Sequence, residues 1–186
     1  CYCIVYQYYT HVYASVYNSS KTKISGDKQI STTGLQEWNY NDCNPYVTES
    51  ITNDNFVIAC FDNTHHTRNY VKRVYVREMN STGTYVTNEI KVFETPDKEH
   101  YFIGQPQIFK NGNGYDLFFI RKEHLGTINR PVYRYHYKLD ASLNTVEFTI
   151  FDYQTEKELD VLEYIGSPIS FVKLEENKYQ ESIAKY

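Results

Sequence analysis

The segment Ile103-Gly104-Gln105-Pro106 decides the fold, because it recurs 62 residues later as Ile165-Gly166-Ser167-Pro168. A weaker copy, Asp42-Cys43-Asn44-Pro45, lies 61 residues before the first. Self-similarity at a fixed period indicates that one supersecondary unit is repeated and stacked on the next. The three prolines therefore mark the same position in successive repeats of about sixty residues.

Each proline is followed by a short extended segment, a polar tip and a compact apolar or aromatic run, which is the pattern of a β-hairpin. Asn, Asp and Gly in the tips supply the positive φ angles that tight turns require. The predicted hairpins pair 46–51 with 56–61, 107–110 with 115–120, and 169–174 with 179–184.

A second hairpin completes each repeat. Its first strand alternates polar and apolar residues, which turns one face inward. The alternating segments are 12–17, 74–77 and 132–137, and the returning strands lie around Ile30, at 90–92 and at 146–150. The predicted fold class is therefore all-β, with four-stranded antiparallel blade-like repeats of about 60 residues, as a β-propeller or an open array of blades. One helix-like stretch, 155–162, falls in a connection between repeats.

The repeat divides the chain into four parts: a partial blade over 1–44 with the last three strands, blades over 45–105 and 106–167, and the first hairpin of another over 168–186. Closed propellers use about four to eight blades, so these parts do not close a ring alone. They continue into further sequence, meet a second copy or stack as an open array. We favour the first and expect an excerpt of a larger protein.

Composition narrows the function classes. The chain has 20 Tyr and 10 Phe, which suit pleated, half-buried surfaces. Charged residues make up 23% of the chain and the net charge is −4. The sequence therefore has no extended basic surface for the phosphates of nucleic acid, and nucleic acid is not an expected partner. No apolar run approaches the roughly 20 residues of a membrane-spanning helix.

The order of motifs within a repeat carries a family resemblance. A Pro-x-Val or Pro-x-Ile start at 45–47 and 106–108 leads to a polar tip, then to Phe56-Val57-Ile58 or Leu117-Phe118-Phe119, then to Val-Tyr and the Asn-Ser-Thr-Gly of 80–83. This order resembles the tandem repeats of extracellular FG-GAP and VCBS-type propellers over nearly the whole chain. The resemblance implies a secreted or cell-surface protein engaged in adhesion or ligand binding.

Those families often carry an Asp-rich calcium loop. The corresponding tips here, 53–55 and 111–113, hold few carboxylates. We therefore predict no cofactor, with calcium left open but without a clear motif. His65-His66, preceded by Asp62, is the one local cluster of metal-ligand types, but adjacent side chains diverge in an extended loop, so we expect a solvated polar loop and no metal site.

Two sequons are candidate glycosylation sites. Asn18-Ser19-Ser20 and Asn80-Ser81-Thr82 stand 62 residues apart at the same predicted hairpin tip. Asn-Ser is also good turn chemistry without any sugar. If both asparagines are modified, the two glycans project from the same edge of the array.

Four cysteines suggest at most two bridges. Cys43 and Cys60 would close a predicted hairpin, with Cys1 or Cys3 reaching toward it in an oxidising compartment. The alternative is four small buried thiols.

Tyr133, Tyr135 and Tyr137 alternate, so all three line one face. They offer a ligand platform for sugars, but burial between neighbouring sheets is the favoured interpretation. Asp62 and Asp116 are candidate carboxylates for a glycosidase, although their spacing across a funnel cannot be derived from the sequence. The alternative is structural: Asp62 ends a strand and Asp116 makes a turn-side hydrogen bond.

These observations predict a non-catalytic extracellular structural or adhesive β-repeat protein that contacts other copies of itself or neighbouring blades and self-assembles into a filament or sheath. Glycans are further expected partners. A carbohydrate-binding or carbohydrate-cleaving β-propeller is the alternative.

Overall fold

The computed structural model describes residues 1–8, 11–30, 45–52, 54–66, 69–95, 101–123, 132–153, 169–175 and 177–183. These residues form strands and turns, and no helix occurs among them. The all-β class predicted from the sequence is confirmed. No helix in the described part of the chain has the length and apolarity that a membrane crossing requires.

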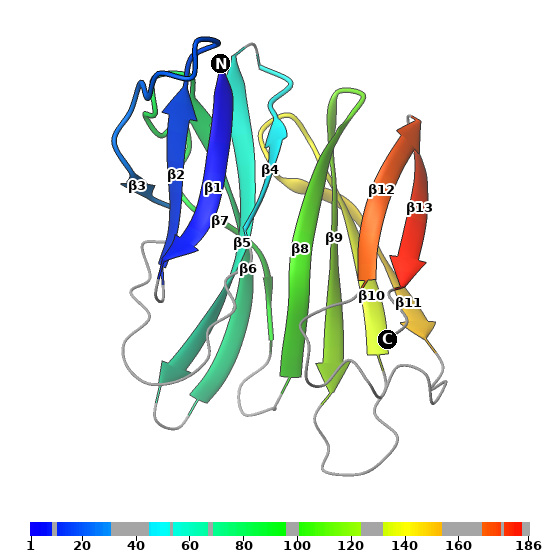
Figure 1. Cartoon of the computed structure of the whole chain (residues 1–186). Helices are drawn as coiled ribbons and strands as arrows, with labels where there is room; N and C mark the ends of the chain where they lie inside the picture. The colour runs from blue at the N-terminus through cyan, green and yellow to red at the C-terminus, as the bar shows by residue number, and fades with distance from the viewer. Residues whose placement is uncertain are drawn as a thin grey trace.

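The strands form four antiparallel sheets, and within each sheet every strand pairs with its sequence neighbours (Figure 1). Sheet A contains β1 (Tyr2–Tyr8), β2 (His11–Tyr17) and β3 (Lys28–Gln29). Sheet B contains β4 (Tyr46–Glu49), β5 (Asn55–His66), β6 (Asn69–Asn80) and β7 (Ile90–Glu94). Sheet C contains β8 (Tyr101–Asn111), β9 (Gly114–Glu123), β10 (Val132–Leu139) and β11 (Thr145–Tyr153). Sheet D is the hairpin of β12 (Ile169–Glu175) and β13 (Lys178–Ile183).

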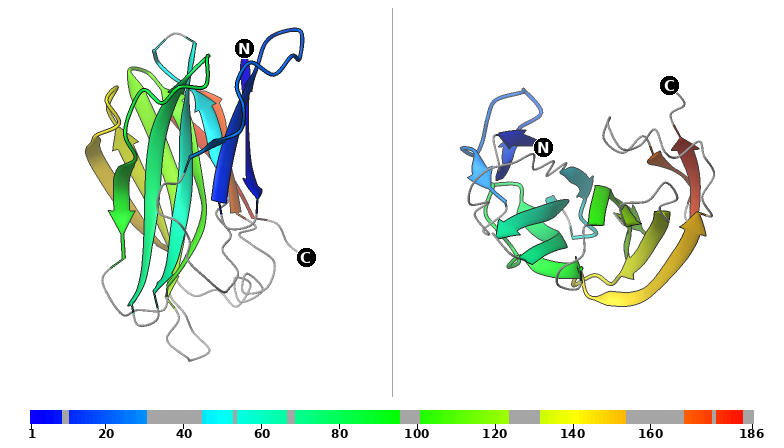
Figure 2. Two further views of the ribbon diagram at one scale, coloured as in Figure 1. Left: turned by 90° about the vertical axis from the view of Figure 1, so that its left-hand side faces the viewer. Right: turned by 90° about the horizontal axis from the view of Figure 1, so that it is seen from below.

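The sheets follow one another along an open arc, as the view from below in Figure 2 shows. Their first strands lie side by side, because β4 contacts β8 and β8 contacts β12. The described sheets do not close into a barrel or a ring.

Sheet B is buried on both faces, which explains the continuous apolar run in β5. Val57, Ala59 and Phe61 pack into a core shared with sheet C. The intervening residues Ile58 and Cys60 pack into a second core shared with sheet A. Alternation along one strand therefore supplies two different sheet junctions.

The β2–β3, β6–β7 and β10–β11 connections start with the same turn. Asn18, Asn80 and Asp140 each accept a backbone hydrogen bond from the residue three positions later, at 3.0 Å. That residue has a positive φ in each case (63°, 77° and 66°). Each turn residue also accepts, through Oδ1, the backbone N–H four positions later at 2.8 Å.

The structure corrects the expected extent of two strands. The polar loop predicted around His65 and His66 is wrong, because β5 continues to His66 and pairs there with Asn69 of β6. The strand predicted to start after Pro106 begins at Tyr101, and the pairing with β9 shifts between Gly104 and Gln107. Proline has no N–H for a ladder hydrogen bond, which accounts for a shift at that position. The helix-like stretch 155–162 lies outside the described residues.

Candidate functional site

Three charged side chains are buried in the described part of the chain: Arg77, Glu78 and Asp116, which are 8%, 6% and 1% exposed. Burying a charge is costly unless it is paired and hydrogen-bonded. Each of the three lies at a different junction between successive sheets, so their partners show how the sheets are held together.

At the junction of sheets A and B, the Arg77 guanidinium reaches from β6 to sheet A. Its Nη1 donates to the Ile30 carbonyl at 3.0 Å, and its Nε donates to the Thr87 carbonyl at 3.3 Å. The guanidinium lies 3.4 Å from the centroid of the Tyr85 ring, an attractive cation–π arrangement. Tyr85 in turn donates its hydroxyl to the Gln29 carbonyl. Arg77 and Tyr85 thus fasten sheet B to the end of sheet A.

At the junction of sheets B and C, Glu78 organises a polar cluster. Its Oε1 accepts the Ser50 hydroxyl at 2.7 Å and the Asn55 amide at 2.8 Å. The Tyr115 hydroxyl, from β9, lies 3.0 Å from Ser50 Oγ and accepts the Ile51 N–H at 2.9 Å. Burial raises the pKa of Tyr115, so the ring keeps its proton and its hydrogen-bonding role.

At the junction of sheets C and D, the Asp116 carboxylate collects three partners. His136 Nε2 lies 2.6 Å from Oδ1, while the Tyr179 hydroxyl and the Asn111 amide both donate to Oδ2. The His136 ring also stacks on Phe118, with centroids 4.3 Å apart. Because Tyr179 belongs to β13, the carboxylate fixes the hairpin of sheet D to sheet C.

The ionisation of this cluster follows from its contacts. Burial opposes ionisation of Asp116, but hydrogen bonds from His136 and Tyr179 lower its pKa below the ordinary 3.8. Burial and the bond to the carboxylate raise the pKa of Tyr179 far above its usual range. The cluster therefore holds an ionised Asp116 beside a protonated Tyr179 at neutral pH.

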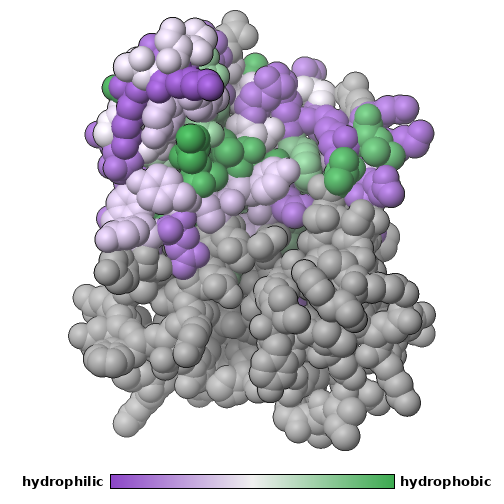
Figure 3. Space-filling view, viewed as in Figure 1, coloured by the Kyte–Doolittle hydropathy of each residue, from purple (hydrophilic) through white to green (hydrophobic). Residues whose placement is uncertain are grey.

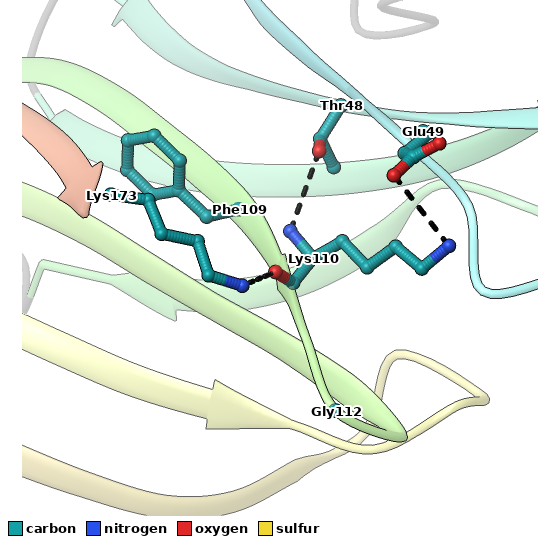
Figure 4. A pocket seen from close by; sticks show the side chains of 6 residues that line it. All are labelled: Thr48, Glu49, Phe109, Lys110, Gly112 and Lys173. Atoms are coloured by element: carbon teal, nitrogen blue, oxygen red, sulfur yellow. Dashed lines mark hydrogen bonds and ion pairs between the residues drawn. The ribbon is translucent and has the colours of Figure 1, made fainter. Parts of the chain in front are cut away.

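A shallow pocket of about 370 Å³ opens where the first strands of sheets B, C and D meet. Figure 4 shows the six lining residues, which are Thr48, Glu49, Phe109, Lys110, Gly112 and Lys173. Lys173 donates its ammonium to the Lys110 carbonyl, and the Lys110 ammonium lies 3.6 Å from Glu49. The pocket therefore holds two ammonium groups, each with a partner inside the protein, and one phenyl ring.

The predicted glycosylation residues occupy matching places. Asn18 and Asn80 use Oδ1 to cap their turns, and the Thr82 hydroxyl also donates to the Asn80 Oδ1 at 2.8 Å. The third turn has Asp140 in the same role, so the cap requires only an oxygen acceptor. The amide nitrogen, which would carry a sugar, is not needed for the cap.

The three tyrosines of the predicted ligand platform share one face of β10, as their alternation indicates. Tyr135 and Tyr137 are 5% and 8% exposed, and Tyr133 packs at the edge of the same core. Tyr135 stacks on Phe119 at 5.0 Å, and burial raises the pKa of Tyr137 to about 12. Their contacts are those of packing between sheets B and C.

The other predicted site residues are not brought together. Cys60 is buried in β5, and Cys43 lies outside the described residues, so the bridge between them stays a prediction. Asp62 lies within β5, opposite Arg73, and does not end the strand as expected. Within the described ranges, no three His, Cys, Asp or Glu residues are placed to hold a metal ion.

Sequence reasoning missed Arg77 and Glu78 as junction residues. A signal was available, because the adjacent charges stand within the strand segment 74–79, whose other residues are Val, Tyr, Val and Met. Tyr179 carried no such signal, since its partner lies 63 residues away in sequence.

No family model matches the chain, and no curated protein or solved structure shows a significant similarity to it.

Proposed function

We propose that the chain is a non-catalytic, extracellular structural or adhesive β-repeat protein, in which each sheet is a blade of a propeller-type array. The blades act as a rigid spacer, and their edges and end faces act as contact surfaces. This architecture resembles the FG-GAP and VCBS-type propellers in its order of motifs, without a clear calcium loop.

The observation that carries the proposal is the placement of one buried charged residue at each sheet junction. Arg77 and Asp116 form hydrogen bonds that fasten one sheet to the next, and Glu78 holds Ser50, whose hydroxyl contacts Tyr115 of the next sheet. Such groups favour one packing arrangement, because displacement of the neighbouring sheet leaves a buried charge without its partners. A repeat protein that works as a spacer needs this resistance to sliding.

The three matching turns support the repeat interpretation and the compartment. The turn residues Asn18, Asn80 and Asp140 have the same capping bonds, and two of the three are sequon asparagines. Asn18 and Asn80 are both partly exposed, as a glycan acceptor must be. A glycosylated edge is compatible with a surface protein whose opposite edges make the contacts.

Immunogold electron microscopy on the source cells tests this function. An antibody against the chain should label material outside the cell, in continuous layers or fibres. Labelling confined to the cell interior would contradict an extracellular structural role.

The pocket favours a second candidate function, the binding of acidic carbohydrate. Lys110 and Lys173 offer ammonium groups and Phe109 offers a ring face. Titration with glucuronic acid and with glucose, followed by NMR, separates charge recognition from general sugar binding. We expect shifts for the acid only, and weaker binding in Lys173→Gln. Lys138→Gln is the matched control, because Lys138 pairs with Glu147 on β11 away from the pocket. Equal shifts with both sugars, or none with either, would exclude this function.

A further inference from the structure

The first sheet of the arc has an aromatic face that no other described sheet covers. The residues of β1 whose side chains point away from sheet B are Tyr2, Ile4, Tyr6 and Tyr8. Tyr2, Ile4 and Tyr8 are 37%, 46% and 59% exposed. Cross-strand stacking joins Tyr2 to Tyr17 at 5.4 Å and Tyr6 to Tyr13 at 5.8 Å. We call this surface the tyrosine face.

The matching positions in the next two sheets are buried. Five residues before the shared turn stand Tyr13, Tyr75 and Tyr135, and the latter two are 6% and 5% exposed under the preceding sheet. One residue before the turn, Met79 and Leu139 are 0% and 3% exposed. In sheet A the residues at these two positions are Tyr13 and Tyr17, and both are only half-buried. The tyrosine face is thus the face that a preceding sheet covers elsewhere in the chain.

The last described sheet also has an exposed face, on the side that points away from sheet C. In sheet D, Lys173 and Tyr179 are directed to sheet C, whereas the pair Val172 and Gln180 lies on the other side. Val172 and Leu174 are 50% and 53% exposed. Figure 3 shows apolar residues on the visible surface over β1 and over β12. We call the side of Val172 and Gln180 the hairpin face.

We propose that the hairpin face of one copy docks on the tyrosine face of a second copy. The inference rests on the proposed function, because it extends the stacking of sheets beyond one chain. At every internal junction the far face of one sheet covers the near face of the next. Docking of the hairpin face on the tyrosine face repeats that junction between chains. The contact is head-to-tail, so it generates a ring if the rotation closes and an open filament if it does not.

The chemistry of the tyrosine face suits association between folded copies. Tyrosine combines a large apolar ring with a hydroxyl that tolerates water, and it is enriched at protein interfaces. Asp27 lies on this face, where hydrogen bonds from Lys23, Ser15 and Tyr6 hold its pKa well below the usual range. Its charge is already paired, so a second copy meets aromatic rings and a neutralised carboxylate.

Sedimentation velocity on the whole chain tests the docking with two face variants and one control. Ile4→Asp places a carboxylate on the tyrosine face, and Val172→Asp places one on the hairpin face. Val146→Asp is the matched control, because Val146 is an exposed aliphatic residue, 69% exposed, on β11 outside both faces. A buried unpaired carboxylate should weaken association by at least about tenfold.

We expect assemblies of two or more copies for the wild-type chain and for Val146→Asp, and monomers for each face variant. An equimolar mixture of Ile4→Asp and Val172→Asp should form dimers and nothing larger, since one intact face remains on each partner. Dimer formation in the mixture also shows that both variants are folded. A monomeric wild-type chain overturns the inference. Assembly that survives both face substitutions overturns it too, while leaving the structural function in place with a different contact.

Discussion

Tyr179 on β13 donates its hydroxyl to the carboxylate of Asp116 on β9, and this bond joins the last hairpin to the sheet before it. The same carboxylate accepts a hydrogen bond from Asn111 and contacts His136 Nε2. Its side chain is 2% exposed, so water does not replace a lost partner. The attachment of sheet D therefore includes one buried ionised group, beside the bonds of Asn177 to Asn111 and of Lys173 to the Lys110 carbonyl.

Tyr179→Phe should loosen sheet D and leave the rest of the chain in place. Removing one hydrogen bond to a buried charge costs about 1.5–3 kcal/mol. Hydrogen exchange should then speed up across 178–183 and remain unchanged in β5 and β6. In an Asp116→Asn background the same substitution should cost less, because the charge is absent. Equal costs in both backgrounds would refute the coupling.

Acidification should release sheet D by the same route. The folded pKa of Asp116 lies below its ordinary value of 3.8, so the carboxylate contributes stability above that value and loses it as pH falls toward the folded pKa. The groups that face it are Asn111 of β8, His136 of β10 and Tyr179 of β13. Exchange in β13 should accelerate below about pH 4, and Asp116→Asn should remove that dependence. An identical acid response in the variant would contradict the assignment.

Gly114→Ala should destabilise the chain, because an added Cβ would lie 2.2 Å from the Leu139 carbonyl oxygen. Backbone cannot move aside as a flexible side chain can, and overpacking of this kind costs about 1–3 kcal/mol. Gly26→Ala is the control, since nothing lies within 4 Å of its added Cβ. Urea unfolding should show a lower midpoint for Gly114→Ala alone. Similar midpoints for the two variants would show that the close approach of β9 and β10 is not required.

The sequon asparagines can be tested without harm to their turns. Asn18→Asp and Asn80→Asp keep the capping oxygen, as Asp140 shows at the third turn, and remove the amide nitrogen that a glycan needs. Secreted from a eukaryotic host, the wild-type chain should carry two glycans by mass spectrometry, and each variant should lose one. After deglycosylation, the free energies of unfolding of the wild-type chain and the variants should agree within about 0.5 kcal/mol. A secreted wild-type chain without sugar would exclude modification.

The positions of the strands could be predicted because prolines and turn residues mark them at a fixed period. The matching caps of Asn18, Asn80 and Asp140 arise from that period. The extension of β5 and β6 could not be predicted, because polar residues such as His65 and Asn69 resemble a loop until they are paired across two strands. A sequence shows local polarity, whereas strand length depends on the partner strand.

The junction contacts depend even more on the partner. Alternation shows that Asp116 and Tyr179 each point to one side of a strand, but it does not show which sheets meet. Arg77 presents the same difficulty, since it reaches the Ile30 carbonyl 47 residues away. The charges of the candidate site were visible in the sequence, and their shared role at the junctions became apparent only from the stacking of the sheets.

Electron microscopy of the native particle, purified from its natural source without chelator or reductant, tests the central claim most directly. A stack of sheets that continues between copies predicts rings or extended fibres built from repeated sheets about 10 Å apart. Isolated particles of one chain, with no ring or fibre at any concentration, would contradict the account.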